Sequence, residues 1–210
     1  MTKNKLHFSD SLKEFANLTK LKYLDVSSNQ VIVDDSEQDL HSLAHAHGLQ
    51  LEGLALSDCG LIALPAILDS LHNLRYIDLS NNPLKRPELL KWLLENNLQL
   101  EVLFMINSSL TGALHLPSFP HPHLSVIDIS WNDLHGNIPS EIGIIFPKLE
   151  DLHMSENEFI GDIPPSLYEI ESLRSLSLSN NQLSGGFGKL PESHAHLGFL
   201  ALSNNKLEGE

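Results

Sequence analysis

Two stretches of sequence that can be laid over each other decide the fold: LSVIDISWNDLHGNIP at residues 124–139 and LEDLHMSENEFIGDIP at residues 149–164. Both have apolar residues at offsets 0, 3 and 5, an asparagine at offset 8, an apolar residue at offset 10 and a final Gly-x-Ile-Pro. The same spacing recurs along the chain, with offset-zero residues at Leu21, Leu51, Leu74, Leu100, Leu124, Leu149, Leu173 and Leu197. Eight copies in phase predict a repeat architecture.

The alternating apolar residues at offsets 3 and 5 indicate a short strand with one buried face. Such a strand is too short to be stable alone, so neighbouring coils are expected to stack and pair their strands in one parallel sheet. At offset 8 a small polar side chain can satisfy backbone groups that a tight buried turn leaves unpaired. The residues at this position are Asn29, Cys59, Asn82, Ser108, Asn132, Asn157, Asn181 and Asn205. We predict that they form a structural ladder, in which Cys59 is a buried thiol rather than a nucleophile.

This spacing resembles the leucine-rich repeat, and the Gly-x-Ile-Pro segments at residues 136–139 and 161–164 resemble its plant-specific class. The resemblance implies an α/β fold, a right-handed leucine-rich-repeat solenoid with a concave parallel β-sheet and a convex side of short helices and loops. It also implies a second small strand on the flank of the solenoid at the Gly-x-Ile-Pro segments. We expect residues 1–210 to form a single domain of about eight coils with no N- or C-terminal cap.

Residues 92–97, 107–112 and 128–132 (WLLENN, NSSLTG and DISWN) resemble the ectodomains of plant leucine-rich repeat receptor-like proteins. This resemblance implies a non-enzymatic module that recognises a peptide or protein ligand in defence or developmental signalling, with a receptor kinase as a possible co-receptor. Such a module lies on the extracellular side of the plasma membrane. Receptor-like proteins also carry a signal peptide, cysteine-paired caps and a transmembrane helix. None is found in this sequence, so we expect an internal piece of a longer receptor or a truncated relative.

Three alternative functions stay open at this point. One is a secreted protein similar to the inhibitors of microbial polygalacturonases, although those inhibitors carry cysteine-paired caps. Another is the ectodomain piece of a leucine-rich repeat receptor kinase, whose kinase would follow the present sequence. The last is a truncated intracellular scaffold or decoy, which the lone cysteine favours.

Composition restricts the partners. The net charge is −14 with histidine neutral, which argues against nucleic acid or an anionic membrane as the main partner. A single cysteine excludes an intramolecular disulfide and a cysteine-based zinc site. No apolar run is long enough to span a bilayer. No catalytic motif is found, and no cofactor or metal is expected. Histidines interpreted as coil or surface residues rather than ligands are His41, His45, His47, His121, His123, His194 and His196.

Two segments depart from the repeat. Residues 31–50 lengthen the first coil, and residues 40–47 within them are expected to form a short helix on the convex side. Residues 87–97 are predicted to form a second convex helix, because four leucines there have helical spacing and Pro87 suits a first helical turn. Trp92 is expected to be partly buried in this helix.

Side chains at offsets 2, 4 and 6 alternate with the buried positions and are expected to face the concave surface. Most are small or polar, but the fourth coil presents the apolar Val102, Phe104 and Ile106. An exposed apolar patch with a polar rim is typical of an interaction site, in which aromatic residues carry most of the binding energy. The predicted ligand-binding residues are Tyr76, Asp78, Val102, Phe104, Ile106, Val126, Asp128, Trp131, Asp151, His153 and Glu156.

The anchors expected to bind a peptide or protein are Tyr76, Phe104, Trp131 and His153. The alternative is that a neighbouring coil, a glycan or a segment outside this sequence covers the patch. His153 also suggests that binding is tuned by pH in the acidic fluid of the plant cell wall. Sequons at Asn17 and Asn107 are glycosylation sites if the protein is secreted, and stay bare if it is not exported.

Overall fold

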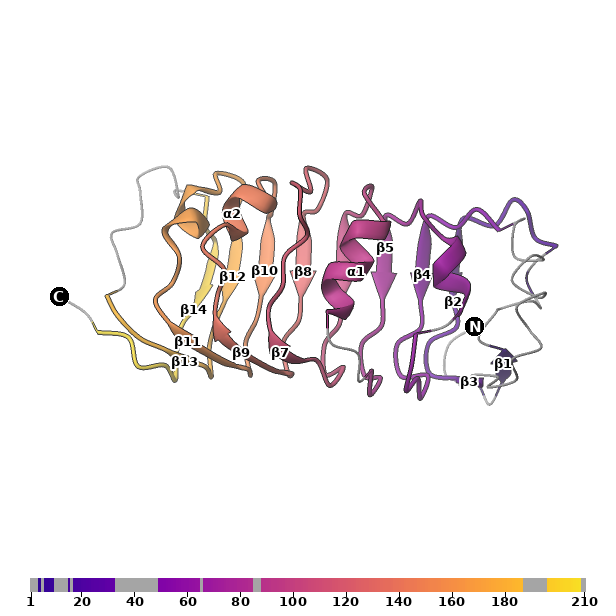
Figure 1. The fold of residues 1–210 in the computed structure, drawn as a ribbon. Helices are drawn as coiled ribbons and strands as arrows, with labels where there is room; N and C mark the ends of the chain where they lie inside the picture. The colour runs from indigo at the N-terminus through magenta and orange to yellow at the C-terminus, as the bar shows by residue number, and fades with distance from the viewer. Residues whose placement is uncertain are drawn as a thin grey trace.

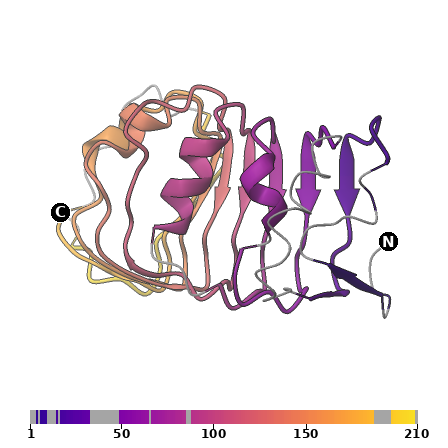
Figure 2. The ribbon, with the colours of Figure 1, turned by 45° about the vertical axis from the view of Figure 1, so that its right-hand side comes forward.

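The computed structural model describes residues 4, 6–9, 15, 17–32, 49–64, 66–84, 88–186 and 196–208. The helix expected over residues 40–47 lies outside the described residues, as do His41, His45, His47 and His194. The described chain winds into a row of stacked coils (Figure 1). Strands lie on one side of this row and short helices on the other (Figure 2), as predicted for a leucine-rich-repeat solenoid.

One parallel sheet of eight strands runs the length of the described solenoid, and neighbouring strands come from consecutive coils. Each strand begins two residues after the offset-zero leucine, as the repeat predicts. The strands are β2 (Tyr23–Asp25), β4 (Gly53–Ala55), β5 (Tyr76–Asp78), β6 (Val102–Phe104), β8 (Val126–Asp128), β10 (Asp151–His153), β12 (Ser175–Ser177) and β14 (Phe199–Ala201).

These strands are three residues long and are held by their neighbours rather than by their own length. The register aligns like positions of successive coils, so Ile77 pairs with Leu103 and Asp78 with Phe104. In β5, β6, β8, β10 and β12 the middle residue is buried and the two outer residues are half-buried. A row of buried aliphatic side chains therefore runs beneath the sheet, and two rows of side chains face outward.

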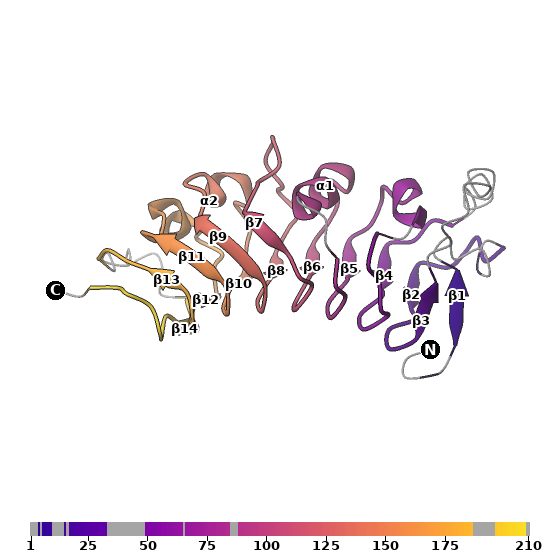
Figure 3. The same cartoon turned by 60° about the horizontal axis from the view of Figure 1, so that its bottom comes forward.

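A second parallel sheet lies on the flank (Figure 3), as the plant-class resemblance implies. Its strands are β7 (Thr111–Ala113), β9 (Asp133–Asn137), β11 (Glu158–Gly161) and β13 (Gln182–Leu183). β9 and β11 begin earlier than the Gly-x-Ile-Pro segments and end before Pro139 and Pro164, which have no N–H to donate to a ladder. A pair that the sequence did not suggest, β1 (His7–Ser9) with β3 (Gln30–Ile32), lies near the N-terminus.

Short helices cover the convex side, as predicted. They are η4 (Ala66–Ser70), α1 (Leu89–Asn96), α2 (Ile142–Ile145) and η5 (Pro165–Glu169). Helix α1 lies within the predicted residues 87–97, buries four leucines and leaves Trp92 partly buried against the core. It begins at Leu89, two residues later than predicted, and Pro87 lies outside the described residues. In Figure 3 the row of coils bends with α1 and α2 on its outer side, so the eight-stranded sheet is the concave face.

His121, expected to be a coil or surface residue, is buried within its coil and is 1% exposed. Its Nε2 lies 2.8 Å from the carbonyl oxygen of Leu94 in the last turn of α1, and its ring packs against Phe146. Burial lowers the pKa of His121, so the ring is neutral and Nε2 carries the proton that it donates. The sequence left open whether His121 is buried, because α1 covers this side of the coil and the coil's local sequence does not show that contact. His123 is exposed, as expected.

The offset-8 residues connect each coil to the one before it. The Asn82 side chain donates to two carbonyls of its own coil and to the carbonyl of Leu56 in the preceding coil, at 2.8–3.1 Å. Its Oδ1 accepts from the amides of Cys59 and Leu61 in the preceding coil, both at 3.0 Å. Side chains that likewise bond both their own coil and an earlier segment of the chain belong to Asn29, Asn132, Asn157, Asn181 and Asn205.

The two exceptions at offset 8 keep part of this pattern. Ser108 is fully buried, and its Oγ donates to the carbonyl of Leu79 in the preceding coil at 3.1 Å. The Cys59 thiol lies 3.5 Å from the carbonyl of Val26 in the coil before it. Burial raises the pKa of the Cys59 thiol, which therefore stays protonated near neutral pH. A buried, protonated thiol is a poor nucleophile.

Replacing Asn132 with alanine removes the acceptor for the Ser108 and Leu110 amides and the donor to three buried carbonyls. Each buried backbone group left unpaired costs about 1–3 kcal/mol, so we expect Asn132→Ala to lower the free energy of unfolding by about 3 kcal/mol or more. Guanidinium denaturation followed by circular dichroism measures this loss. The control is Gln182→Ala, which removes one exposed side-chain bond on the flank strand β13 and should cost less than about 0.5 kcal/mol. Equal losses would contradict a ladder role.

Candidate functional site

The outward side chains of the eight strands form two rows on the concave sheet, which together we name the concave strip. The first row holds, in register, Tyr23, Gly53, Tyr76, Val102, Val126, Asp151, Ser175 and Phe199. The second row holds Asp25, Ala55, Asp78, Phe104, Asp128, His153, Ser177 and Ala201. Eight of the residues predicted to bind a ligand lie on this strip, and Ile106, Trp131 and Glu156 follow the strands at its edge.

An aromatic corner occupies the middle of the concave strip. The rings of Tyr76 and Phe104 meet edge to face, with centroids 5.9 Å apart and an interplanar angle of 75°. Both side chains are half-buried, and Val102 and Val126 continue the apolar surface in the first row. The sequence predicted these four residues as neighbours on one surface, and the register of β5, β6 and β8 brings them together.

Two carboxylates bracket Phe104 in the second row, Asp78 from β5 and Asp128 from β8. Each has one oxygen committed to the turn after its strand, because Oδ1 accepts from the amide of the serine two residues later, Ser80 or Ser130. The same bond joins Ser27 to Asp25. This Asx turn is a local reason for the recurring aspartate. The second oxygen of Asp78 has no hydrogen-bond partner among the described residues.

Offset 6 proved different from the expectation that its side chains face a ligand. Three serines at this position, Ser80, Ser130 and Ser179, are buried, whereas Ser27, Ser57 and Ser155 are half-buried and Ser203 is exposed. Ser80 Oγ accepts from the amide of Ile106 in the next coil, and Ser203 donates to Ser179. The chain has already left the strand at this offset, so strict alternation no longer holds. Ile106 is half-buried there.

A polar chain surrounds His153 toward the C-terminal end of the strip. Its Nδ1 lies 3.4 Å from Asp128 Oδ2, and its Nε2 lies 2.7 Å from Ser175 Oγ. The ring of Phe199 meets it edge to face, with centroids 6.4 Å apart. Sequence analysis missed Ser175 and Phe199, because a serine and an aromatic residue one or two coils away carry no motif. Only the register of β10, β12 and β14 makes them neighbours.

The Asp128–His153 contact shifts both pKa values. The hydrogen bond to Asp128 raises the pKa of His153 although burial opposes it, and Asp151 adds a smaller effect in the same direction. Burial disfavours the charged form of Asp128, but the bonds from His153 and Ser130 outweigh burial and hold its pKa below the usual value. At mildly acid pH the protonated His153 and the ionised Asp128 thus form an ion pair. At alkaline pH the imidazole of His153 is neutral beside the Asp128 carboxylate.

The connectivity Asp128–His153–Ser175 is that of a nucleophile, base and orienting acid, so its chemistry has to be considered. Acyl transfer also needs donors aimed at a developing oxyanion. The Ser175 amide donates to the carbonyl of Glu150 at 2.9 Å, and β12 pairs with β10 and β14 on its two sides. The amides beside Ser175 are therefore committed to the sheet. The arrangement positions the His153 imidazole, and these amides are not available as donors to an oxyanion.

Trp131 occupies a column of residues at offset 7 that all have left-handed backbone conformation. The other members are Ser28, Asp58, Asn81, Asn107, Glu156, Asn180 and Asn204, with φ between 50° and 58°. Where two asparagines are neighbours in this column, the side-chain amide of one donates a hydrogen bond to the other, from Asn107 to Asn81 and from Asn204 to Asn180. Trp131 has φ 61° and is 60% exposed. A bulky aromatic residue is disfavoured in this conformation, unlike asparagine.

The remaining predicted residues lie beside this group. Asp151 is half-buried in the first row between Val126 and Ser175. Glu156 follows Trp131 in the offset-7 column, and its Oε1 accepts from the Asn180 side chain. The predicted set thus divides into an aromatic corner around Phe104 and a polar cluster around His153, with Asp128 contacting the second and adjoining the first.

Tyr23 extends the aromatic surface toward the N-terminus, which the sequence reading missed. It is 61% exposed, and a Cβ at Gly53 would lie 2.3 Å from its ring. The absence of a side chain at Gly53 therefore lets the ring lie across β4. Gly53 belongs to the small residues of the strip, and its role is to accommodate Tyr23.

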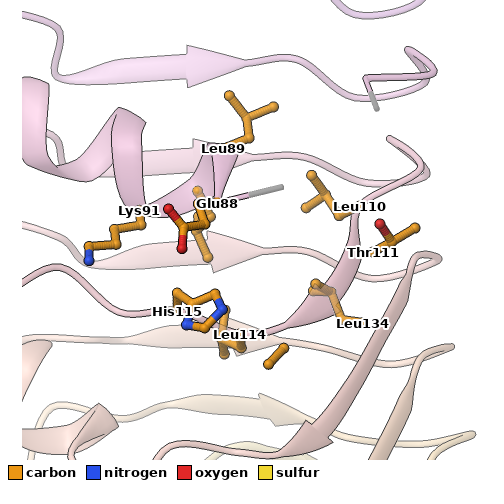
Figure 4. Close-up of a pocket in the computed structure, with 10 residues that line it drawn as sticks. Glu88, Leu89, Lys91, Leu110, Thr111, Leu114, His115 and Leu134 are labelled. Carbon is orange, nitrogen blue, oxygen red and sulfur yellow. The ribbon is translucent and has the colours of Figure 1, made fainter. Parts of the chain in front are cut away.

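Outside the strip, a hollow opens between α1 and β7 (Figure 4). Buried leucines form its walls, namely Leu89, Leu90, Leu110, Leu114 and Leu134. Glu88, Lys91 and His115 also line it. It is a packing gap between coils rather than a built ligand site. Among the described residues no group of His, Cys, Asp and Glu is placed to hold a metal, and no helix is long and apolar enough to cross a membrane.

Comparison with known families identifies the fold. The leucine-rich repeat profile matches residues 73–97, 123–144, 148–170 and 172–197, and a second leucine-rich repeat profile matches residues 17–35. These segments together span more than half of the chain. The chain belongs to the leucine-rich repeat family. Its leucine-rich repeat domain matches plant receptor-like proteins over most of its length.

Two of these relatives set the scale of the resemblance. The chain is 37% identical to Cuscuta receptor 1 of Solanum lycopersicum, over 95% of this chain and 20% of that protein. It is 38% identical to Receptor-like protein 14 of Arabidopsis thaliana, over 80% of this chain and 17% of that protein. The leucine-rich repeat chain thus spans about a fifth of the length of these curated relatives.

A solved structure with the same architecture is the leucine-rich repeat ectodomain of the plant membrane receptor kinase GASSHO1/SCHENGEN3 from Arabidopsis thaliana, in complex with Casparian strip integrity factor 2. It is 26% identical with a TM-score of 0.74, covering 98% of this chain and 27% of that one. Relatives of this kind are receptor ectodomains, a class of binding module that is typically non-catalytic.

The backbone at Trp131 gives a prediction about stability. Trp131→Asn replaces a residue that is strained at positive φ with one that tolerates it, so the free energy of unfolding should rise by about 0.5–1 kcal/mol. Guanidinium denaturation measures the change. The reciprocal variant Asn107→Trp, one coil earlier in the same column, should be destabilised. A less stable Trp131→Asn protein would show that the indole makes packing contacts that outweigh the strain.

The raised pKa of His153 gives a prediction about pH. Protonated His153 is favoured in the folded chain, so its stabilisation is complete below the unfolded pKa of about 6.5 and is lost as pH rises through the higher folded pKa. We expect His153→Gln to lose about 0.5 kcal/mol more stability at pH 5 than at pH 8, because the pair is partly exposed to solvent. Denaturation at both pH values measures it. In an Asp128→Asn background the difference should shrink, because Asp151 alone then favours the protonated ring and burial opposes it.

Proposed function

We propose that the concave strip binds a peptide or protein ligand, and that the chain is part of the ectodomain of a plant receptor-like protein. The observation that carries the proposal is the exposed Trp131 in a left-handed position where the other coils have Ser, Asp, Asn or Glu. Strain of this kind persists where a residue serves a function rather than the fold. Tryptophan is also the side chain most enriched in binding hot spots.

The rest of the strip supports a ligand of extended shape. Tyr76 and Phe104 form an apolar corner in the two coils before that of Trp131, and Phe199 lies beyond His153 toward the C-terminal end. These groups follow the long axis of the solenoid, along which Figure 1 shows the strands side by side. A peptide lying along the strip would contact several coils at once. Protonation of His153 would add a positive charge within that contact, which supports binding tuned by pH.

If the chain is part of a receptor-like protein, its location and partners follow. In a secreted receptor the strip faces the extracellular side of the plasma membrane, a partner receptor kinase acts as co-receptor, and signalling serves defence or development. The similarity to a receptor kinase ectodomain favours one alternative, that the chain belongs to a receptor kinase and uses the same strip. In either case Asn17 and Asn107 are exposed acceptors for glycans. A glycan at Asn107 would stand beside Trp131 in the offset-7 column and limit access to it.

The test uses peptides selected for binding to the folded chain from a random twelve-residue display library. Selected peptides are resynthesised, and their affinity is measured by isothermal calorimetry. Phe104→Ser should weaken binding at least tenfold, because it removes an aromatic anchor from the centre of the strip. The matched control is Ile160→Ser, which removes an exposed apolar side chain from β11 on the flank and should leave affinity unchanged. Peptides that tolerate Phe104→Ser in a folded variant would contradict the assignment of the strip.

A further inference from the structure

The centre of the concave strip combines features that individually are ordinary and together select one kind of ligand group. Two aromatic rings, Tyr76 and Phe104, lie edge to face, and Asp78 and Asp128 flank Phe104 in the same row. Aromatic faces attract a cation through their quadrupole, and carboxylates attract it through charge and hydrogen bonds. A side chain that lies across Phe104 is therefore within reach of both carboxylates.

Lysine and arginine side chains of the described residues do not neutralise the carboxylate of Asp78. The lysine and arginines beside the strands pair with glutamates along the edge of the sheet, as Lys22 does with Glu52 at 3.0 Å. Arg75, adjacent to Tyr76 in sequence, donates from Nε to Glu101 at 2.9 Å. The next such pair is Arg174 with Glu150. Charge along this edge is thereby balanced, whereas Asp78 has no cationic partner among the described residues.

The two carboxylates are not equivalent. Oδ1 of Asp78 accepts a hydrogen bond from the Ser80 amide, and Oδ2 remains available to a ligand. Oδ1 of Asp128 accepts a hydrogen bond from the Ser130 amide, and its Oδ2 contacts His153 Nδ1. The pKa of Tyr76 is raised by burial and then by the negative charges of Asp78 and Asp25, which indicates a negative potential at the aromatic corner. The dominant charge facing a ligand here is thus that of Asp78.

We propose that this cluster of Tyr76, Asp78, Phe104 and Asp128 binds the guanidinium or ammonium group of a basic side chain in the ligand. The inference rests on the proposed function, because it names the chemistry of the ligand that the strip takes. Arginine fits best, since its planar group stacks on an aromatic face while its N–H groups reach carboxylates on either side. The ligand is then a basic peptide, which also suits the net charge of −14 of the chain.

The direct probe is a capped tripeptide, acetyl-Gly-Arg-Gly-amide, titrated into the folded chain at pH 8 and low salt. Its partner is the same tripeptide with citrulline, which keeps the shape of arginine and removes the charge. NMR shifts of the Tyr76 and Phe104 ring protons report binding. The arginine tripeptide should bind with a millimolar dissociation constant and the citrulline tripeptide at least fivefold more weakly. Raising the salt concentration should weaken the arginine complex. Equal binding of the two tripeptides would overturn the proposal.

Matched charge variants locate the site. Asp78→Asn keeps an oxygen to accept from the Ser80 amide and should weaken the arginine tripeptide at least threefold. Asp133→Asn changes the net charge equally, but Asp133 is exposed on β9 of the flank sheet, so binding should be unchanged. Phe104→Leu should also weaken binding at least threefold while keeping an apolar residue on β6. A similar loss in Asp78→Asn and Asp133→Asn would mean that only overall charge matters, and would overturn the site.

The peptides selected against the strip separate this inference from the proposed function. Peptides that lose affinity in Phe104→Ser and are enriched in arginine or lysine support both. Peptides that lose affinity in Phe104→Ser, contain no basic residue and tolerate Asp78→Asn would uphold the proposed function and overturn the cation site. Specific binding of the arginine tripeptide, with no selected peptide sensitive to Phe104→Ser, would uphold the cation site while the proposed function fails.

Discussion

The buried side chain at offset 8 is the constraint on which the rest of the structure depends. After a strand of three residues the chain must turn sharply into the coil. That turn leaves buried backbone N–H and C=O groups of two neighbouring coils without backbone partners. Asn82 and Asn132 each satisfy five of these groups, which ties a coil to the coil before it. Because the same solution repeats, successive strands are brought into register, and the outward side chains form straight rows.

Regular rows make departures from the repeat informative. Aspartate at offset 4 and serine at offset 6 recur because they close the turn after the strand, so their recurrence has a local explanation. Trp131 and the pair of Tyr76 with Phe104 have no such explanation. The repeat does not require these aromatic side chains, and the left-handed backbone at Trp131 disfavours one. These are the residues for which we propose a ligand-binding role.

His153 shows how the solenoid makes sites that no short motif reveals. Its three contacts, Asp128, Ser175 and Phe199, come from three other coils. Each is separated from it in sequence by about one or two repeats, and any of them changed alone would leave the repeat pattern intact. His121 illustrates the same point in the core, because its burial depends on α1 of the preceding coil. Sequence periodicity describes a coil, whereas these histidines are controlled by contacts between coils.

The sequence by itself determined the strand of the coil, its ladder residue and the convex helix α1, because each follows from hydrophobic period or turn chemistry within one repeat. The flank strands followed from the resemblance to the plant class of repeat. The sequence also identified Tyr76, Phe104, Trp131 and His153 as outward-facing residues. Only the tertiary structure decided that Ser80, Ser130 and Ser179 at offset 6 are buried, that Gly53 makes room for Tyr23, and that Asp128 contacts His153. The physical reason is that these contacts depend on the register and spacing between coils, which many different coil sequences share.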